Sequence, residues 1–99
     1  NYEFIEGDIF KTIPKFIKRK KHLKIALLHL DLDLYPGTKF ALEKLAKYMV
    51  KGGIIMFDDY GLEYGETKAV DEFLKKNKKK LRIKLNSIHQ KPSYIIIDK

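Results

Sequence analysis

Two continuous apolar runs, each followed by acidic residues, constrain the fold of this chain more than any other feature. The first is LKIALLHL at residues 23–30, followed by DLDLYPGT, and the second is GIIMF at residues 53–57, followed by DDYG. Uninterrupted apolar runs of this length are typical of parallel strands that are covered on both faces. An amphipathic segment at residues 38–51 separates them, and such a crossover is nearly always right-handed and brings its strands side by side or nearly so. The pattern predicts a parallel strand pair in an α/β sheet.

The rest of the chain continues the alternation of strands and helices. Two apolar runs near the end are joined by a very short connection, so we expect them to pair as an antiparallel hairpin at one edge of the sheet. The predicted order is βαβαβαββ, in a single domain over residues 1–99 with a mainly parallel sheet. The predicted strands are residues 2–7, 23–30, 53–57, 81–88 and 93–98, and the predicted helices begin after Asp8 or Thr12, at residue 38 and at residue 66.

Composition places the chain among globular proteins of a reducing compartment. Apolar residues make up 44% of the 99 residues, and cysteine is absent, which excludes disulfides and thiolate metal sites. No apolar run approaches the roughly 18 residues that a membrane helix needs, and no signal-peptide pattern is present. We therefore expect a cytoplasmic location. The chain opens on Asn1 and runs directly into strand-like residues, as a piece of a longer polypeptide or a trimmed protein would.

The net charge of +8 raises the question of nucleic-acid binding. The cations are almost all lysines, with arginine only at positions 19 and 82, so the guanidinium fork that binds phosphate or guanine is scarce. The lysines cluster where helices are expected to end, and there they complement the helix dipole. The scarcity of arginine and the position of the lysines argue against nucleic acid as the main partner. The alternative is a non-catalytic α/β module that binds a partner or RNA through its lysine-rich surface.

The acidic residues after the two apolar runs form a candidate metal site. Asp31 and Asp33 follow the first run, and Asp58 and Asp59 follow the second. Ligands of open parallel sheets bind beyond the carboxyl ends of the strands, and carboxylates this close repel one another by about 4 kcal/mol per pair at an effective dielectric near 20. A cation relieves that repulsion, and oxygen ligands without cysteine favour Mg²⁺. Aspartates at such positions also serve as helix caps or turn residues, which stays open as an alternative.

These residues carry a resemblance to a known family. The segments DLDLYPGT, GGIIMFDDYG and AVDEF, in this order and spacing, are similar to the macrocin O-methyltransferase family, and FIEGDIFKTIPKFI extends the likeness to most of the chain. The resemblance implies a class I methyltransferase fold, a Rossmann-like sheet of which this chain supplies strands 3 to 7, with helices on both faces. It also implies a Mg²⁺-dependent O-methyltransferase that moves a methyl group from S-adenosylmethionine to a hydroxyl of a small molecule such as a sugar.

The resemblance assigns roles to individual residues. The metal aspartates of the family match Asp31, Asp58 and Asp59, and Asp31 is also the position of the general base. Asp33 matches a recurring acid that we place beside the metal ligands rather than among them. A methyltransferase for another acceptor, in which the acids are only structural, is the second enzymatic interpretation.

The chain departs from the family pattern at the cofactor site. The Gly-rich turn that holds the methionine part of the cofactor is missing, and Gly52-Gly53, the one closely spaced glycine pair, is expected to end a helix. The family loop that borders the adenine matches Asp8 and Ile9. We therefore expect the C-terminal portion of a class I methyltransferase domain, inactive alone. The methyl acceptor and the oligomeric state, including a homo-oligomer, stay open.

Several other residues have more than one interpretation. His29, inside the first apolar run, is expected to be a packed histidine rather than a base or ligand, and His89 to lie on the surface of the hairpin turn. Tyr35 and Tyr60 follow the acidic clusters and either flank a substrate or cap the end of the sheet. The loop at residues 61–65 is either a mobile lid or a plain connector.

Overall fold

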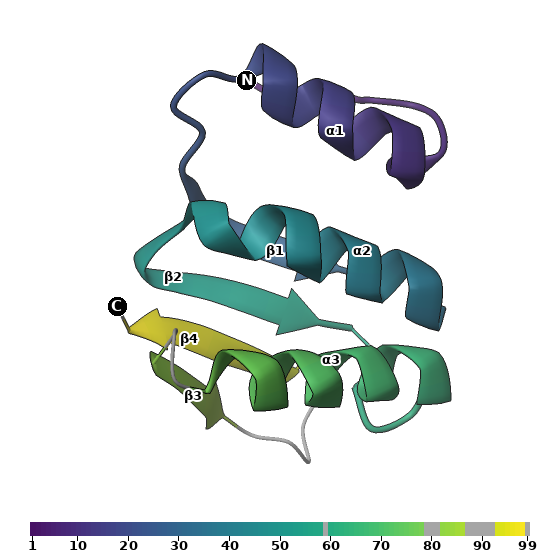
Figure 1. Cartoon of the computed structure of the whole chain (residues 1–99), viewed down its shortest axis with the longest axis vertical. Coiled ribbons are helices and arrows are strands. Elements are labelled where there is room, and N and C mark those ends of the chain that lie inside the picture. Colours follow the sequence, from purple (N-terminus) through teal and green to yellow (C-terminus); the bar gives the residue numbers. More distant parts are fainter. Residues whose placement is uncertain (59, 79–81, 87–92, 99) are drawn as a thin grey trace.

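The computed structural model describes residues 1–58, 60–78, 82–86 and 93–98, and it shows three helices packed against a sheet (Figure 1). For residues 82–86 the description covers the backbone alone. None of the described helices is both long enough and apolar enough to cross a lipid bilayer. In chain order the elements are α1 (Ile9–Arg19), β1 (Ile25–Leu30), α2 (Tyr35–Leu45), a 3₁₀ turn (Ala46–Tyr48), β2 (Met49–Phe57), α3 (Tyr64–Asn77), β3 (Arg82–Asn86) and β4 (Ser93–Asp98).

The sheet has the strand order β1-β2-β4-β3. The strands β1 and β2 pair in parallel, with Leu30 beside Phe57, as the two apolar runs and their crossover helix predict. The strand β4 is antiparallel to both of its neighbours, β2 and β3. The predicted antiparallel hairpin is thus confirmed. The expectation of a mainly parallel sheet is wrong for the described residues, because one strand pair is parallel and two are antiparallel.

The predicted strand at residues 2–7 does not form. This segment does not belong to the sheet, and the side chains of Tyr2 and Phe4 are 86% and 85% exposed. Arg19 at the end of α1 holds the segment through an ion pair with Glu3 at 2.5 Å. An extended segment becomes a strand only when a neighbouring strand pairs with its amide and carbonyl groups. In the described part of the chain no strand lies beside residues 2–7, so the β-favouring sequence stays unpaired.

The boundary between α2 and β2 also differs from the expectation. The helix ends at Leu45 rather than near residue 51, and Met49 begins β2 opposite Ile25 of β1. The glycines at positions 52 and 53 lie inside β2 instead of ending a helix. A side chain at Gly53 would place its Cβ 2.9 Å from the carbonyl oxygen of Val50, and the register between β1 and β2 shifts between Ile25 and Leu27. Glycine makes this irregularity possible because it has no Cβ to collide with the backbone.

All three helices lie in one layer (Figure 1). The rings of Phe10 in α1 and Phe40 in α2 are 4.7 Å apart, and the hydroxyl of Tyr35 at the start of α2 donates to Glu72 of α3. Every second side chain of the strands points toward the helices, and these side chains form the core together with residues of α2 and α3. The sheet contributes Leu30, Ile55, Phe57, Ile95 and Ile97 to this core.

The opposite side of the sheet, called the open face below, has no described helix over it. Its residues are half-buried or exposed, and strand register places them together: Leu27, His29, Ile54, Met56, Tyr94 and Ile96. Helices on both faces are therefore not confirmed in the described residues. The continuous apolar runs place apolar side chains on both faces of the sheet, and the helices cover one of these two faces.

Candidate functional site

Two of the predicted metal ligands lie on neighbouring strand ends. Asp31 directly follows Leu30, the last residue of β1, and the amide of Asp58 donates to the Leu30 carbonyl oxygen at 3.1 Å. This hydrogen bond continues the parallel pairing one residue past Phe57, so the two aspartates leave the same edge of the sheet. Both are solvent-accessible. The third predicted ligand, Asp59, lies outside the described residues.

His29 is not packed in the core, and that prediction is wrong. Its side chain is 48% exposed on the open face, and its Nε2 atom lies 3.5 Å from Oδ1 of Asp58, whose side chain is 44% exposed. The physical reason is strand alternation: Leu28 and Leu30 point toward the helices, so the residue between them points the other way. An apolar run by itself does not tell which of its faces is covered.

Asp33 lies in the tight turn that joins β1 to α2. It adopts a positive φ of 59°, a conformation in which aspartate is enriched, and the amide of Leu34 donates to the Leu32 carbonyl oxygen at 2.6 Å. The first turn of α3 packs closely on this turn. A Cβ added at Gly65 would lie 2.6 Å from the Tyr35 amide nitrogen and 2.9 Å from the Asp33 carbonyl oxygen. The geometry therefore gives Asp33 a role in shaping the turn.

The two tyrosines after the acidic clusters are tied to α3. The hydroxyl of Tyr35 donates to Glu72 at 2.6 Å, and that of Tyr60 donates to Asp71 at 2.7 Å. Burial of the phenol and then its hydrogen bond to Asp71 raise the pKa of Tyr60 to about 12. The Tyr35 side chain thus joins α2 to α3, and the Tyr60 side chain joins the end of β2 to α3, which favours the capping interpretation.

Glu66 was not predicted to have a role, and it is fully buried in the first turn of α3. Its position was open to inference, because it precedes Ala69, Val70 and Phe73 by three, four and seven residues and so lies on their inward stripe. A carboxylate in the first turn is favoured by the helix dipole. Its neighbour Gly65 contacts the β1–α2 turn, which places this buried acid near the strand ends.

The donor chemistry of the strand ends fits a hard divalent cation. Mg²⁺ keeps several water ligands and commonly takes one or two carboxylates from a protein, and Asp31 and Asp58 supply two accessible ones. Within the described residues no three side chains of His, Asp or Glu form a group that could hold a metal. A site here therefore depends on two carboxylates and water, or on residues beyond the described ones.

The predicted adenine contacts lie at the start of α1. The Asp8 carboxylate caps the helix by accepting a hydrogen bond from the Phe10 amide at 2.9 Å, as expected from the sequence. Ile9 is partly buried, and its Cδ1 lies against Gly37 of α2. The cap is confirmed, and the contact with a cofactor stays a prediction.

Comparison with known proteins identifies the family. The sequence profile described as Macrocin-O-methyltransferase (TylF) matches residues 1–95. The chain belongs to the macrocin-O-methyltransferase family. No curated protein matches it.

Solved structures of methyltransferases resemble the chain in sequence and fold. CalS11, described as a TDP-rhamnose 3'-O-methyltransferase of calicheamicin biosynthesis, is 32% identical with a TM-score of 0.76, and the match covers 93% of this chain and 39% of CalS11. A second CalS11 structure gives 31% identity and a TM-score of 0.75 over 93% of this chain and 36% of that one. The O-methyltransferase NovP is 29% identical with a TM-score of 0.68 over 77% of this chain and 31% of NovP. The chain thus spans about two fifths or less of these relatives.

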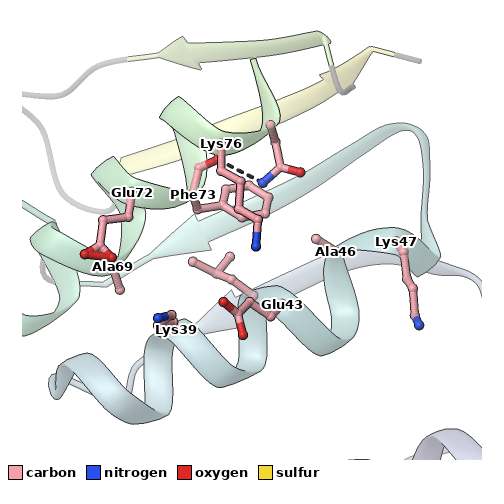
Figure 2. A pocket seen from close by; sticks show the side chains of 10 residues that line it. Lys39, Glu43, Ala46, Lys47, Ala69, Glu72, Phe73 and Lys76 are labelled. Atoms are coloured by element: carbon pink, nitrogen blue, oxygen red, sulfur yellow. Dashed lines mark hydrogen bonds between the residues drawn. The ribbon is translucent and has the colours of Figure 1, made fainter. Parts of the chain in front are cut away.

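A groove of about 540 Å³ lies between α2 and α3 (Figure 2), and neither Asp31 nor Asp58 lines it. Its charged residues follow one another at a spacing of four, so lysines and glutamates alternate: Lys39 and Glu43 on α2, Lys47 in the 3₁₀ turn after it, and Glu72 and Lys76 on α3. Such spacing lets opposite charges stabilise the helices themselves. In this member of the macrocin-O-methyltransferase family, the charges of the groove are thus explained by helix stability, and the candidate metal ligands lie elsewhere.

Proposed function

We propose that this chain is the C-terminal, metal-binding portion of an S-adenosylmethionine-dependent O-methyltransferase that acts on a hydroxyl of a sugar or a similar small molecule. Family membership and the activity in the CalS11 description support the reaction and the type of acceptor. The observation that carries the proposal is the placement of Asp31 and Asp58 on the ends of two paired parallel strands. Ligands of open α/β sheets bind at this edge.

Each residue then has a defined task. Asp31 and Asp58, together with Asp59, would hold Mg²⁺, which when bound would lower the pKa of an acceptor hydroxyl and fix its direction. The Asp31 carboxylate would accept the hydroxyl proton while the hydroxyl oxygen takes the methyl group from the sulfonium. Most of the rate then comes from positioning, because the reacting atoms must be in line.

The cofactor half of the site is proposed only in part. Asp8 and Ile9 would border the adenine at the start of α1, and the chain offers no Gly-rich turn for the methionine part of S-adenosylmethionine. The 99-residue chain is therefore expected to bind the metal without transferring methyl groups. Residues 1–99 act in this proposal as one portion of a class I methyltransferase domain.

Calorimetric titration with Mg²⁺ tests the metal site directly. We expect the wild-type chain to bind, and Asp58→Asn to reduce the affinity by at least about tenfold, since a neutral amide replaces a charged ligand. Glu43→Gln is the matched control, because it removes one negative charge from an exposed residue of the α2–α3 groove. Equal affinity for the wild type and Asp58→Asn would leave the acids with a structural role only.

RNA binding through the lysine-rich surface is the competing function. Arg19, one of the two arginines, is paired with Glu3 at the surface. Binding to single-stranded RNA that weakens steeply with salt and ignores Mg²⁺ would favour this alternative over the enzymatic proposal.

A further inference from the structure

The contact between His29 and Asp58 joins two neighbouring strands on the open face. His29 is paired in register with Met56, and Asp58 follows Met56 by two residues, so the two side chains point to the same side of the sheet. The Nε2 and Oδ1 atoms are 3.5 Å apart, which is within ion-pair distance but beyond the roughly 2.7–3.2 Å of an ordinary N–H···O hydrogen bond. In the described part of the chain, the Asp58 carboxylate contacts the side chain of His29.

This contact concerns one oxygen of the carboxylate. The imidazole approaches Oδ1 of Asp58. Carboxylates that bind metals are commonly held by a second group that fixes their orientation, and loss of that group weakens metal affinity about 10–100-fold. Because nearly half of each side chain is exposed, the contact has little value for the stability of the fold.

We propose that His29 is a positioning residue, whose Nε2 orients the Asp58 carboxylate for a divalent cation at the ends of β1 and β2. This inference rests on the proposed function, because it assumes that Asp58 is a ligand. The imidazole acts on the carboxylate and does not itself bind the cation. For a cation held by Asp31 and Asp58, the orientation of the Asp58 carboxylate is then fixed by His29 of β1 before the cation binds.

Binding of Mn²⁺, a spectroscopic substitute for Mg²⁺, tests this role by electron paramagnetic resonance on the 99-residue chain at one fixed pH. His29→Phe keeps a planar ring and removes the nitrogen, and we expect it to weaken Mn²⁺ binding at least about tenfold. His29→Gln places an amide donor at similar reach, and we expect it to recover most of the affinity. His22→Asn is the matched control, because His22 is exposed and has a positive φ that asparagine tolerates.

The outcomes separate this inference from the proposed function. Affinity of His29→Phe within about twofold of wild type, while Asp58→Asn loses binding, would overturn the role of His29 and keep the metal site. Tighter binding by His29→Phe would overturn it as well, since the imidazole would then compete with the cation. Failure of the wild-type chain to bind Mn²⁺ would overturn both. Thermal unfolding without metal shows whether each variant is folded, and we expect all four variants to unfold near the wild-type temperature.

Discussion

Tyr60 shows how a single side chain ties the end of β2 to the helix layer. Its hydroxyl donates to Asp71 of α3, and its ring lies 6.5 Å from that of Phe57, the last residue of β2. Partial burial is the larger reason, and the Asp71 carboxylate the smaller, for a Tyr60 pKa of about 12. Both causes favour the neutral phenol in the folded chain, because a phenolate would be poorly solvated and would lie beside an anion.

This pKa gives a pH dependence with a defined sign. A pKa raised by folding stabilises the native state fully below the unfolded value near 10, and that contribution is lost as the pH rises toward about 12. We therefore expect the free energy of unfolding to decline between pH 10 and 12, and to decline less in Tyr60→Phe. Ultraviolet difference titration of wild type against Tyr60→Phe should show a phenol that ionises near pH 12. An ionisation of Tyr60 close to pH 10 would contradict the geometry.

At the scale of elements, the strand ends are shaped by the contact of α3 with the β1–α2 turn. Gly65, the second residue of α3, brings the helix backbone against Asp33 and Tyr35, where a Cβ would be 2.6 Å from an amide nitrogen. Gly37, the third residue of α2, has only ordinary contacts, with its nearest atom at 3.5 Å from an added Cβ. Of these two glycines near helix starts, Gly65 thus has no room for a side chain and Gly37 has room for a methyl group.

The two glycines make a matched pair of substitutions. Gly65→Ala should destabilise the chain by about 1–3 kcal/mol, because backbone atoms have to move to admit the methyl group. Gly37→Ala should be neutral or stabilising by up to about 1 kcal/mol, since alanine favours the helix and fits the space. Denaturant unfolding monitored by circular dichroism measures both. Equal effects of the two changes would show that helix propensity, rather than the contact with the turn, governs these positions.

The elements that the sequence predicts well are those whose signal is local. Strand β1, strand β2, the inward stripe of α3 and the cap at Asp8 follow from apolar periodicity and capping chemistry alone. Residues 2–7 do not form a strand because pairing depends on a neighbour, which propensity does not supply. The helix α2 ends earlier than expected, and Met49 pairs with Ile25 of β1, a contact between distant residues that a local helical pattern does not predict.

The candidate site divides in the same way. The adjacency of Asp31 and Asp58 follows from the rule for strand ends, and the structure confirms it. The contact of His29 with Asp58 depends on which face of the strand the helices cover, and the sequence run is apolar on both faces. The buried position of Glu66 was readable from its spacing to Ala69 and Val70. Glu66 was not expected in the core, because carboxylates are rarely fully buried.

At the scale of the whole molecule, the described sheet has one covered face and one open face. The open face carries apolar side chains from β1, β2 and β4, and β1 is an edge strand of the described sheet. Leu27 of β1 is 58% exposed on that face. An edge strand with exposed apolar side chains is a site for pairing with another chain. The net charge of +8 opposes such pairing by repulsion between like molecules.

We therefore expect the 99-residue chain to self-associate through the β1 side of the sheet, more strongly as salt screens its charge. At about 1 M salt the Debye length falls to roughly 3 Å, so the repulsion is largely removed while apolar burial remains. Leu27→Lys should weaken association by tenfold or more, because burial of a leucine side chain contributes about 1.5–3 kcal/mol. Leu62→Lys adds the same charge on an exposed leucine of the loop before α3, and should change association little. Sedimentation velocity at low and high salt measures all three chains. If Leu27→Lys and Leu62→Lys reduced association equally, net charge rather than the open edge would be the controlling feature.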